Sequence, residues 1–200
     1  MSRPREFAEP DVLQKATEVF WKKGYHAASM QDLVDAMGIN RASLYGTFGD
    51  KHQLYVRCLQ TYRDALHYNL TTLTARRRPV RERLATLFRH LVNEAVQDDE
   101  RKGCLLANAA LERGAEDPDT LREVRLHLDF TESLFRTLLN EGQRGGEIPT
   151  DRPVADLARY LMTLLAGFRV LGKVAPDRAT LESALAPALD ALNATEPFRA

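Results

Sequence analysis

Apolar side chains recur every three or four residues along almost the whole of this 200-residue chain, and nowhere do they alternate convincingly with polar ones. A period near 3.6 residues is typical of an amphipathic helix, whereas a period of two marks a strand. The composition agrees, because 29 Leu and 25 Ala stand against 13 Val and Ile together, and β-branched residues favour strands. The pattern therefore predicts an all-α fold of about nine helices.

Glycines and a basic run followed by proline divide this pattern into segments. Each glycine stands where an apolar helical segment ends, and the basic run separates a longer fourth segment from the rest. We therefore expect two domains, residues 1–75 and residues 76–200. The helical segments end at Gly24, Gly38, Gly49 and the run Arg76–Pro79.

Charge is distributed unevenly, although the formal net charge is zero. Residues 1–78 hold 12 Lys and Arg against 8 Asp and Glu, and the remainder has the matching acidic excess. A mildly basic first third is compatible with a polyanionic partner at that end of the chain.

Several classes of protein are disfavoured by what the chain does not contain. Two cysteines are too few for a disulfide framework, the N-terminus has no apolar signal region, and no apolar run approaches the about 20 residues that span a bilayer. The five histidines lack metal-ligand spacing, and no phosphate-binding glycine motif or nucleophile elbow is present. We expect a cytoplasmic protein that is not an enzyme, with no cofactor, metal or membrane contact.

The most informative stretch is residues 29–48, which predicts two short helices joined by a tight turn. Ser29 and Asp32 have capping-box spacing, with Asp shorter than the preferred Glu or Gln. Gly38 stands where a left-handed residue would end the first helix, and Asn40 where a cap would begin the second. This arrangement is that of a helix-turn-helix.

The second of these helices is expected to bury Leu44 and Phe48 and to turn short and polar side chains outward. Such side chains allow close approach to base edges, and no carboxylate lies between Asn40 and Gly49 to repel phosphate. A plain helical hairpin inside a core is the alternative interpretation. The outward residues are Arg41, Ala42, Ser43, Tyr45, Gly46 and Thr47.

Four motifs in residues 7–65 resemble the DNA-binding domain of TetR/AcrR-family transcriptional repressors. They are VFWKKGY at 19–25, SMQDL at 29–33, MGI at 37–39 and ASLYGTFGDK at 42–51. The resemblance implies a homodimer whose recognition helices enter successive major grooves of a palindromic operator. It also implies a C-terminal domain that releases the DNA when a small-molecule effector binds.

Roles carry over from this resemblance position by position. Ser29 and Tyr45 match phosphate contacts of the family, and Lys51 matches the basic residue that opens its fourth helix. Gly46 departs from the family, which often has a larger residue there, so a contact from that position is in doubt. The full predicted DNA-binding set is Ser29, Asn40, Arg41, Ala42, Ser43, Tyr45, Gly46, Thr47 and Lys51, of which Arg41, Ser43 and Thr47 fall among positions that read bases.

Residues 79–200 resemble the family mainly in helix layout, which implies that the last two helices form a four-helix bundle with a partner copy. Their wide apolar faces support this, and burial within a monomer is the alternative. Pro187 lacks a backbone donor and predicts a kink or a break in the last helix. The expected dimer contacts are Leu157, Leu161, Leu165, Phe168, Leu181, Leu185 and Leu189.

Helix order places Phe88, Cys104, Phe130 and Tyr160 in the expected effector pocket. Cys104 precedes a short helix, whose N-terminal dipole favours a reactive thiolate, so sensing of an electrophile, oxidant or soft metal is one interpretation. A small buried apolar residue is the other. The whole chain thus predicts a ligand-responsive, operator-binding repressor, and the alternative is an all-helical adaptor without specific DNA binding.

Overall fold

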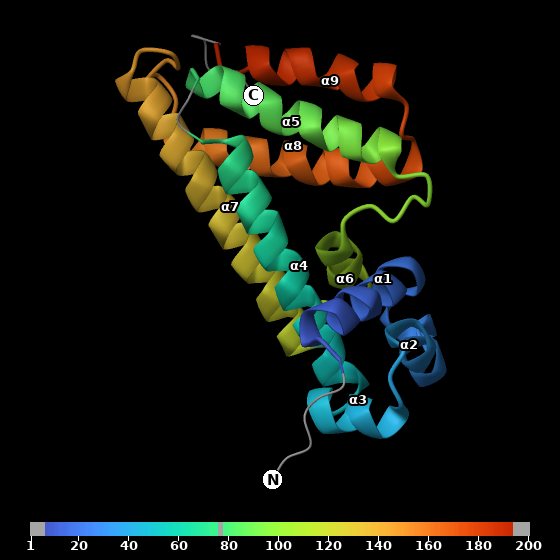
Figure 1. Cartoon of the computed structure of the whole chain (residues 1–200). Helices are drawn as coiled ribbons and strands as arrows, with labels where there is room; N and C mark the ends of the chain where they lie inside the picture. The colour runs from blue at the N-terminus through green and yellow to red at the C-terminus, as the bar shows by residue number, and fades with distance from the viewer. Residues whose placement is uncertain (1–6, 76–77, 194–200) are drawn as a thin grey trace. The chain divides into compact units, whose positions relative to one another are not determined.

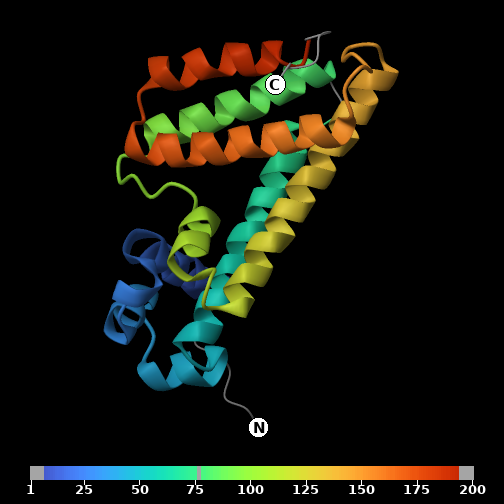
Figure 2. The ribbon, with the colours of Figure 1, turned by 180° about the vertical axis from the view of Figure 1, so that it is seen from behind.

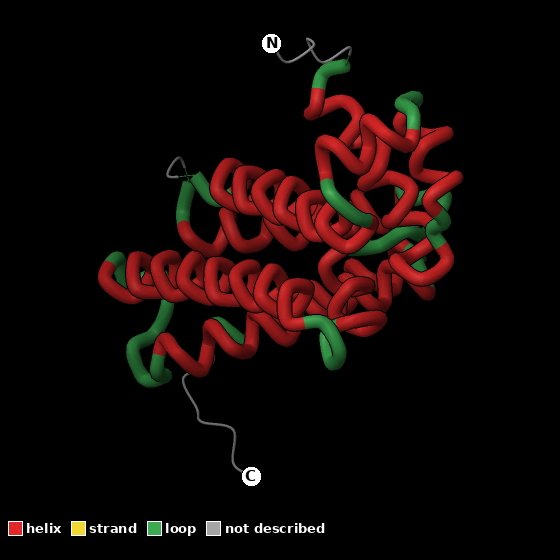
Figure 3. Tube along the Cα trace, turned by 90° about the horizontal axis from the view of Figure 1, so that it is seen from below, coloured by secondary structure: helices red, strands yellow, loops and turns green. Residues whose placement is uncertain are grey.

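The structure is a computed structural model that describes residues 7–75 and 78–193. Every regular element in these residues is a helix, so the predicted all-α class is confirmed (Figure 3). None of these helices is long and apolar enough to cross a membrane. The helices are α1 (Glu9–Ala27), α2 (Met30–Met37), α3 (Arg41–Phe48), α4 (Lys51–Leu73), α5 (Val80–Gln97), α6 (Leu105–Arg113), α7 (Pro118–Arg144), α8 (Val154–Val174) and α9 (Arg178–Asp190).

The chain folds into two compact units, and each takes part of the long helices α4 and α7. The N-terminal unit combines the chain up to Ala65 with Cys104–Arg125, and the C-terminal unit combines Leu66–Gly103 with the chain from Leu126 onward. The segment around α6 thus belongs to the N-terminal unit although it lies far along the sequence. A functional domain boundary at residue 75 stays a prediction.

In the N-terminal unit, α1 packs against α2 and α6, and α2 packs against α3 (Figure 2). Apolar residues at helical spacing fill this core, as the sequence pattern predicts. α1 departs from helical geometry at Gly24, where φ is 77° and ψ is 174°, so the expected stop is a break before the helix resumes to Ala27. The largest fully buried side chains of α1–α4 are Phe20, Leu33, Met37, Leu44, Leu54, Tyr55 and Leu59.

In the C-terminal unit, α5, α8 and α9 lie side by side (Figure 1). Their apolar faces share one core, in which Phe88 and Phe168 pack with ring centroids 5.6 Å apart. Of the predicted kink or break at Pro187, the break is wrong, because α9 continues to Asp190, and a kink stays a prediction. Because Pro187 has no N–H, the Ser183 carbonyl lacks its helical hydrogen bond. Ser183 is exposed, so water can donate to this carbonyl instead.

Candidate nucleic-acid interface

The capping box at the start of α2 is confirmed. The backbone N–H of Asp32 donates to Ser29 Oγ at 3.1 Å, and the backbone N–H of Ser29 donates to the Asp32 carboxylate at 2.9 Å. Lys23 Nζ donates to the other carboxylate oxygen at 2.7 Å. The Lys23 hydrogen bond, followed by those from Ser29, lowers the pKa of Asp32 from 3.8 to about 2. At neutral pH, α2 therefore begins against an ionised carboxylate.

The turn between α2 and α3 also has its predicted form. Gly38 is left-handed, with φ 68° and ψ 29°, and its N–H donates to the Val34 carbonyl at 3.0 Å. An added Cβ would meet nothing within 4 Å, so glycine is required here by conformation and not by space. Ile39 is buried next to this turn, and it fixes the angle at which the chain enters α3.

Helix α3 presents four of the six outward residues that the sequence predicts, and buries the two apolar residues expected inside. The side-chain oxygen of Asn40 accepts from the Ser43 N–H at 2.8 Å, which caps the helix. Leu44 and Phe48 are buried on one face. The opposite face exposes two small residues flanked by a guanidinium and a phenol, which suits close approach to a base edge. The exposed residues are Arg41, Ala42, Tyr45 and Gly46, whereas Ser43 and Thr47 are half-buried.

Two predicted phosphate ligands already have protein partners. Ser29 Oγ donates to Asp32 at 2.8 Å, and Lys51 Nζ lies 4.5 Å from the centroid of the Tyr25 ring. Burial lowers the pKa of Lys51; the charge of Glu112 opposes this effect, and the charge of Arg113 adds to it. Arg113 lies over the same ring, 4.0 Å from its centroid. Tyr25 therefore connects the last turn of α1 to the first turn of α4.

A hollow of about 350 Å³ lies beside the end of α3 within the N-terminal unit. Thr47 is the member of the predicted DNA-binding set on its lining, and none of the four predicted effector residues is there. The lining residues are Thr47, Phe48, Gly49, His52, Gln53, Val56, Arg57, Gln60, Asp119 and Arg122.

The seven side chains predicted to contact a second copy lie in or against the C-terminal unit's own core. Six of them are buried there, and Leu189 packs partly buried against them. A helical period marks an apolar face without telling whether the chain or a partner covers it. The exposed apolar residues of α8 are instead Tyr160, Val170, Leu171 and Val174.

The predicted effector residues have different surroundings. Phe88 is fully buried, Phe130 stacks on His67 with centroids 3.8 Å apart, and the Tyr160 hydroxyl donates to the Ala188 carbonyl at 3.4 Å. Cys104 is buried and stands at the N-cap position of α6 in the N-terminal unit, without a capping hydrogen bond from its side chain. Its burial favours the interpretation of a small apolar residue over that of an exposed sensor.

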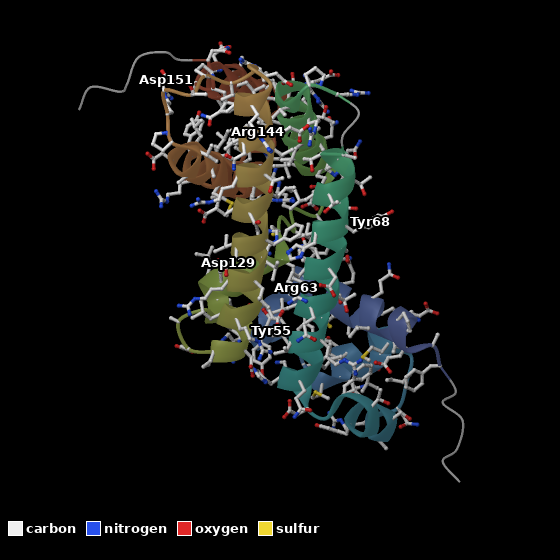
Figure 4. All side chains as sticks on the ribbon, turned by 90° about the vertical axis from the view of Figure 1, so that its left-hand side faces the viewer. Tyr55, Arg63, Tyr68, Asp129, Arg144 and Asp151 are labelled. Carbon is white, nitrogen blue, oxygen red and sulfur yellow. The ribbon has the colours of Figure 1, made fainter. Side chains whose placement is uncertain are left out.

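Three acidic residues that the sequence analysis missed connect the α6–α7 segment to α1 and α4. Glu112 accepts from backbone N–H groups after the α1 break, and the Asp117 carboxylate lies 3.1 Å from His52 Nε2. Glu123 is buried and pairs with Arg63, which Figure 4 labels on α4. The partners are 60 to 87 positions apart, so no local spacing in the sequence signals them.

Comparison with protein families agrees with this geometry. The model of bacterial regulatory proteins of the tetR family matches residues 12–58, and that of the tetracyclin repressor-like C-terminal domain matches residues 80–187. The HTH-type transcriptional regulator YezE of Bacillus subtilis is 31% identical over 96% of this chain and 100% of its own. The HTH-type transcriptional repressor ComR of Escherichia coli is 29% identical over 90% and 85%.

Solved structures show the same relationship. A cysteine mutant of the TetR-family regulator CifR, in complex with 26-base-pair operator DNA, has a TM-score of 0.84 and 31% identity, over 94% of this chain and 99% of that one. The reduced form of E. coli NemR shares the fold at 20% identity, with a TM-score of 0.83 over 94% and 98%. The chain belongs to the TetR family of DNA-binding transcriptional regulators, and the predicted family is confirmed.

Proposed function

We propose that the chain is a repressor that binds a palindromic operator as a homodimer and leaves it when a small molecule occupies the C-terminal unit. The observation that carries this proposal is the exposed, carboxylate-free face of α3 on a helix whose cap, turn and buried face are all fixed. The operator complex of CifR supports it, as does the repressor ComR. As an operator-binding repressor, the protein would act in the cytoplasm and would not be an enzyme.

The exposed face of α3 suits the major groove, which admits an α-helix. Arg41 lies in the first turn, where a guanidinium can make two hydrogen bonds to a guanine edge. Ala42 and Gly46 let the helix backbone come close to the bases, and an added Cβ at Gly46 would meet nothing within 4 Å of the protein itself. Tyr45 and Lys51 are the proposed phosphate ligands, and these contacts position the helix without reading sequence.

A second copy is proposed to dock on the exposed apolar stripe of α8, because the residues first expected there are occupied by the chain's own core. This stripe consists of Tyr160, Val170, Leu171 and Val174. A two-fold axis through such a contact would pair two recognition helices with two half-sites. Phe88 and Phe130 remain the proposed effector residues of the C-terminal unit, and Tyr160, which was also predicted for the pocket, is assigned here to the docking stripe.

The test begins with the duplexes that the full-length chain enriches from a random-sequence library. Arg41→Ala should weaken binding to the enriched duplex by about 10- to 100-fold and relax the preference at one base pair of each half-site. Arg89→Ala removes the same charge from an exposed position of α5 and should change binding little. Failure to enrich any duplex would overturn the proposal in favour of an adaptor.

Two further readouts belong to the same test. Leu171→Arg should shift the sedimentation coefficient to that of a monomer, whereas Leu111→Arg, at a leucine that is 84% exposed in α6, should not. A reporter gene behind the enriched sequence decides the direction of regulation. FasR of Mycolicibacterium smegmatis, 35% identical over 42% of this chain, is an activator, so higher reporter output with the protein present would overturn the repressor assignment.

A further inference from the structure

We propose that Glu112 is a positioning residue for DNA binding. Its carboxylate caps the last turn of α1 across the break at Gly24 and thereby fixes the backbone that leads into the helix-turn-helix. The inference rests on the proposed function, since it concerns the same DNA-binding site.

The break in α1 leaves backbone donors that need partners. Gly24 has non-helical dihedral angles, so the residues that follow it begin a new helical turn, and the first N–H groups of a helix have no acceptor within that helix. Glu112 supplies both acceptors, because Oε2 accepts from the Tyr25 N–H and Oε1 from the His26 N–H, each at 2.9 Å.

The glycine at the break gives this carboxylate its room. A Cβ at position 24 would lie 2.9 and 3.0 Å from the two Glu112 oxygens, closer than ordinary contact allows. The φ of 77° is likewise one that side-chain-bearing residues rarely adopt. Gly24 and Glu112 therefore act together: Gly24 allows the break in α1, and Glu112 accepts hydrogen bonds from the N–H groups that the break leaves free.

The capped turn controls both sides of the DNA-binding motif. It ends at Ala27, two residues before Ser29 caps α2. The ring of Tyr25 in the same turn contacts Lys51 Nζ and lies 4.9 Å, centroid to centroid, from the ring of Tyr55. A change in the position of Glu112 is thus transmitted to the start of α2 and to the first turns of α4.

A second anchor keeps α6 from moving independently of this turn. Asp117, four residues after Arg113, accepts hydrogen bonds from Arg113 and from the Thr120 hydroxyl and lies against His52 in the first turn of α4. Burial raises the pKa of Asp117, but the bonds from Thr120, His52 and Arg113 outweigh burial and hold the pKa below its ordinary value. The end of α6 is therefore fixed to α1 on one side and to α4 on the other.

Electrostatics and a positioning role predict opposite changes in DNA affinity when Glu112 is replaced. DNA is a polyanion, so removal of a carboxylate from the DNA-binding unit by itself should tighten binding to any duplex. A positioning role predicts the opposite for the preferred duplex, because a displaced helix-turn-helix loses its base contacts. Glu116 is an exposed glutamate of the same segment and provides the matched control.

The experiment compares Glu112→Ala, Glu112→Gln and Glu116→Gln in the full chain. Two probes are used, the duplex that the wild type enriches and an unrelated duplex of equal length, and amide hydrogen exchange is followed at Tyr25 and His26. Glu112→Ala should speed hydrogen exchange at both amides and weaken binding to the preferred duplex by about tenfold. It should not weaken binding to the unrelated duplex. Glu112→Gln keeps one neutral acceptor, so its exchange rates and affinities should fall between those of Glu112→Ala and wild type. Glu116→Gln should weaken binding to neither duplex.

Each outcome decides the proposal. Unchanged exchange at both amides would overturn the cap, and faster exchange with an unchanged preference between duplexes would overturn the positioning role. The isosteric Glu112→Gln keeps the test valid if Glu112→Ala lowers the melting temperature. A wild type that prefers no duplex would overturn the proposed function instead, and the exchange rates would still decide the cap.

Discussion

Each of the two units of this protein combines an apolar core with polar contacts, but the polar contacts lie at different places. In the C-terminal unit, α5, α8 and α9 share a core made mostly of buried leucine and phenylalanine side chains. Its polar contacts include the buried Arg83, which donates to the Thr74 carbonyl and pairs with Glu141, and the Asp177 cap of α9.

In the N-terminal unit, an apolar core is combined with directional contacts at helix ends, among them the Ser29 capping box, the Asn40 cap and the Glu112 cap. Apolar cores tolerate changes of shape when volume is kept, whereas hydrogen bonds fix positions. In the N-terminal unit these contacts flank α2 and α3, so they fix the helix-turn-helix on which the proposed base contacts depend.

The largest effect that this comparison predicts is in the C-terminal core. Phe88→Ala should lower the free energy of unfolding by about 3–5 kcal/mol, because it removes a fully buried ring and leaves a cavity against Phe168. Urea unfolding at a fixed protein concentration measures this. Leu111→Ala, at a mostly exposed leucine, should stay within about 0.5 kcal/mol of wild type. A loss below about 1 kcal/mol for Phe88→Ala would show that the layer is not close-packed and would break the comparison.

A smaller effect, with a pH dependence, is predicted for the cap of α2. The folded-state pKa of Asp32 is about 2, below its ordinary 3.8, so the ionised carboxylate stabilises the fold at neutral pH. This contribution should be lost as the pH falls through about 4 towards about 2. The melting temperatures of wild type and Asp32→Asn should therefore differ at pH 7 and converge in acid. Ser29→Ala removes the cap without removing a charge and should cost about 1 kcal/mol. A gap for Asp32→Asn that stays constant down to pH 2.5 would contradict the assignment.

The smallest effect concerns two glycines of the helix-turn-helix. An added Cβ meets nothing within 4 Å at Gly46 or at Gly38, so the two positions differ only in backbone conformation. Gly46→Ala should stabilise the protein by about 0.5–1 kcal/mol, because Gly46 lies inside a helix. Gly38→Ala should destabilise it by about 1 kcal/mol, because position 38 is left-handed. Equal shifts of the two melting temperatures would show that local conformation does not limit this turn.

Much of the DNA-binding motif could be predicted from the sequence, because its ends are set by neighbours within four residues. Ser29 with Asp32, Asn40 with Ser43, and the left-handed Gly38 are all local arrangements. The buried and exposed faces of α3 follow from helical periodicity alone. Pro187 shows the limit of such reasoning, because a local rule predicts a break that the helix avoids with an exposed carbonyl.

Only the tertiary structure decided which surfaces meet. The apolar residues of α8 and α9 satisfy a helical period whether the chain or a second copy covers them, and the structure assigns the predicted ones to the chain's own core. No sequence neighbour of Glu112 indicates that it caps a helix, since the two N–H groups that donate to it lie 86 and 87 positions away. The sequence by itself determined the helices, the caps of α2 and α3 and the exposed face of α3, because those depend on neighbours along the chain. The apolar residues that stay exposed on α8 and the Glu112 cap depend on contacts between distant segments, which form only when the helices have packed.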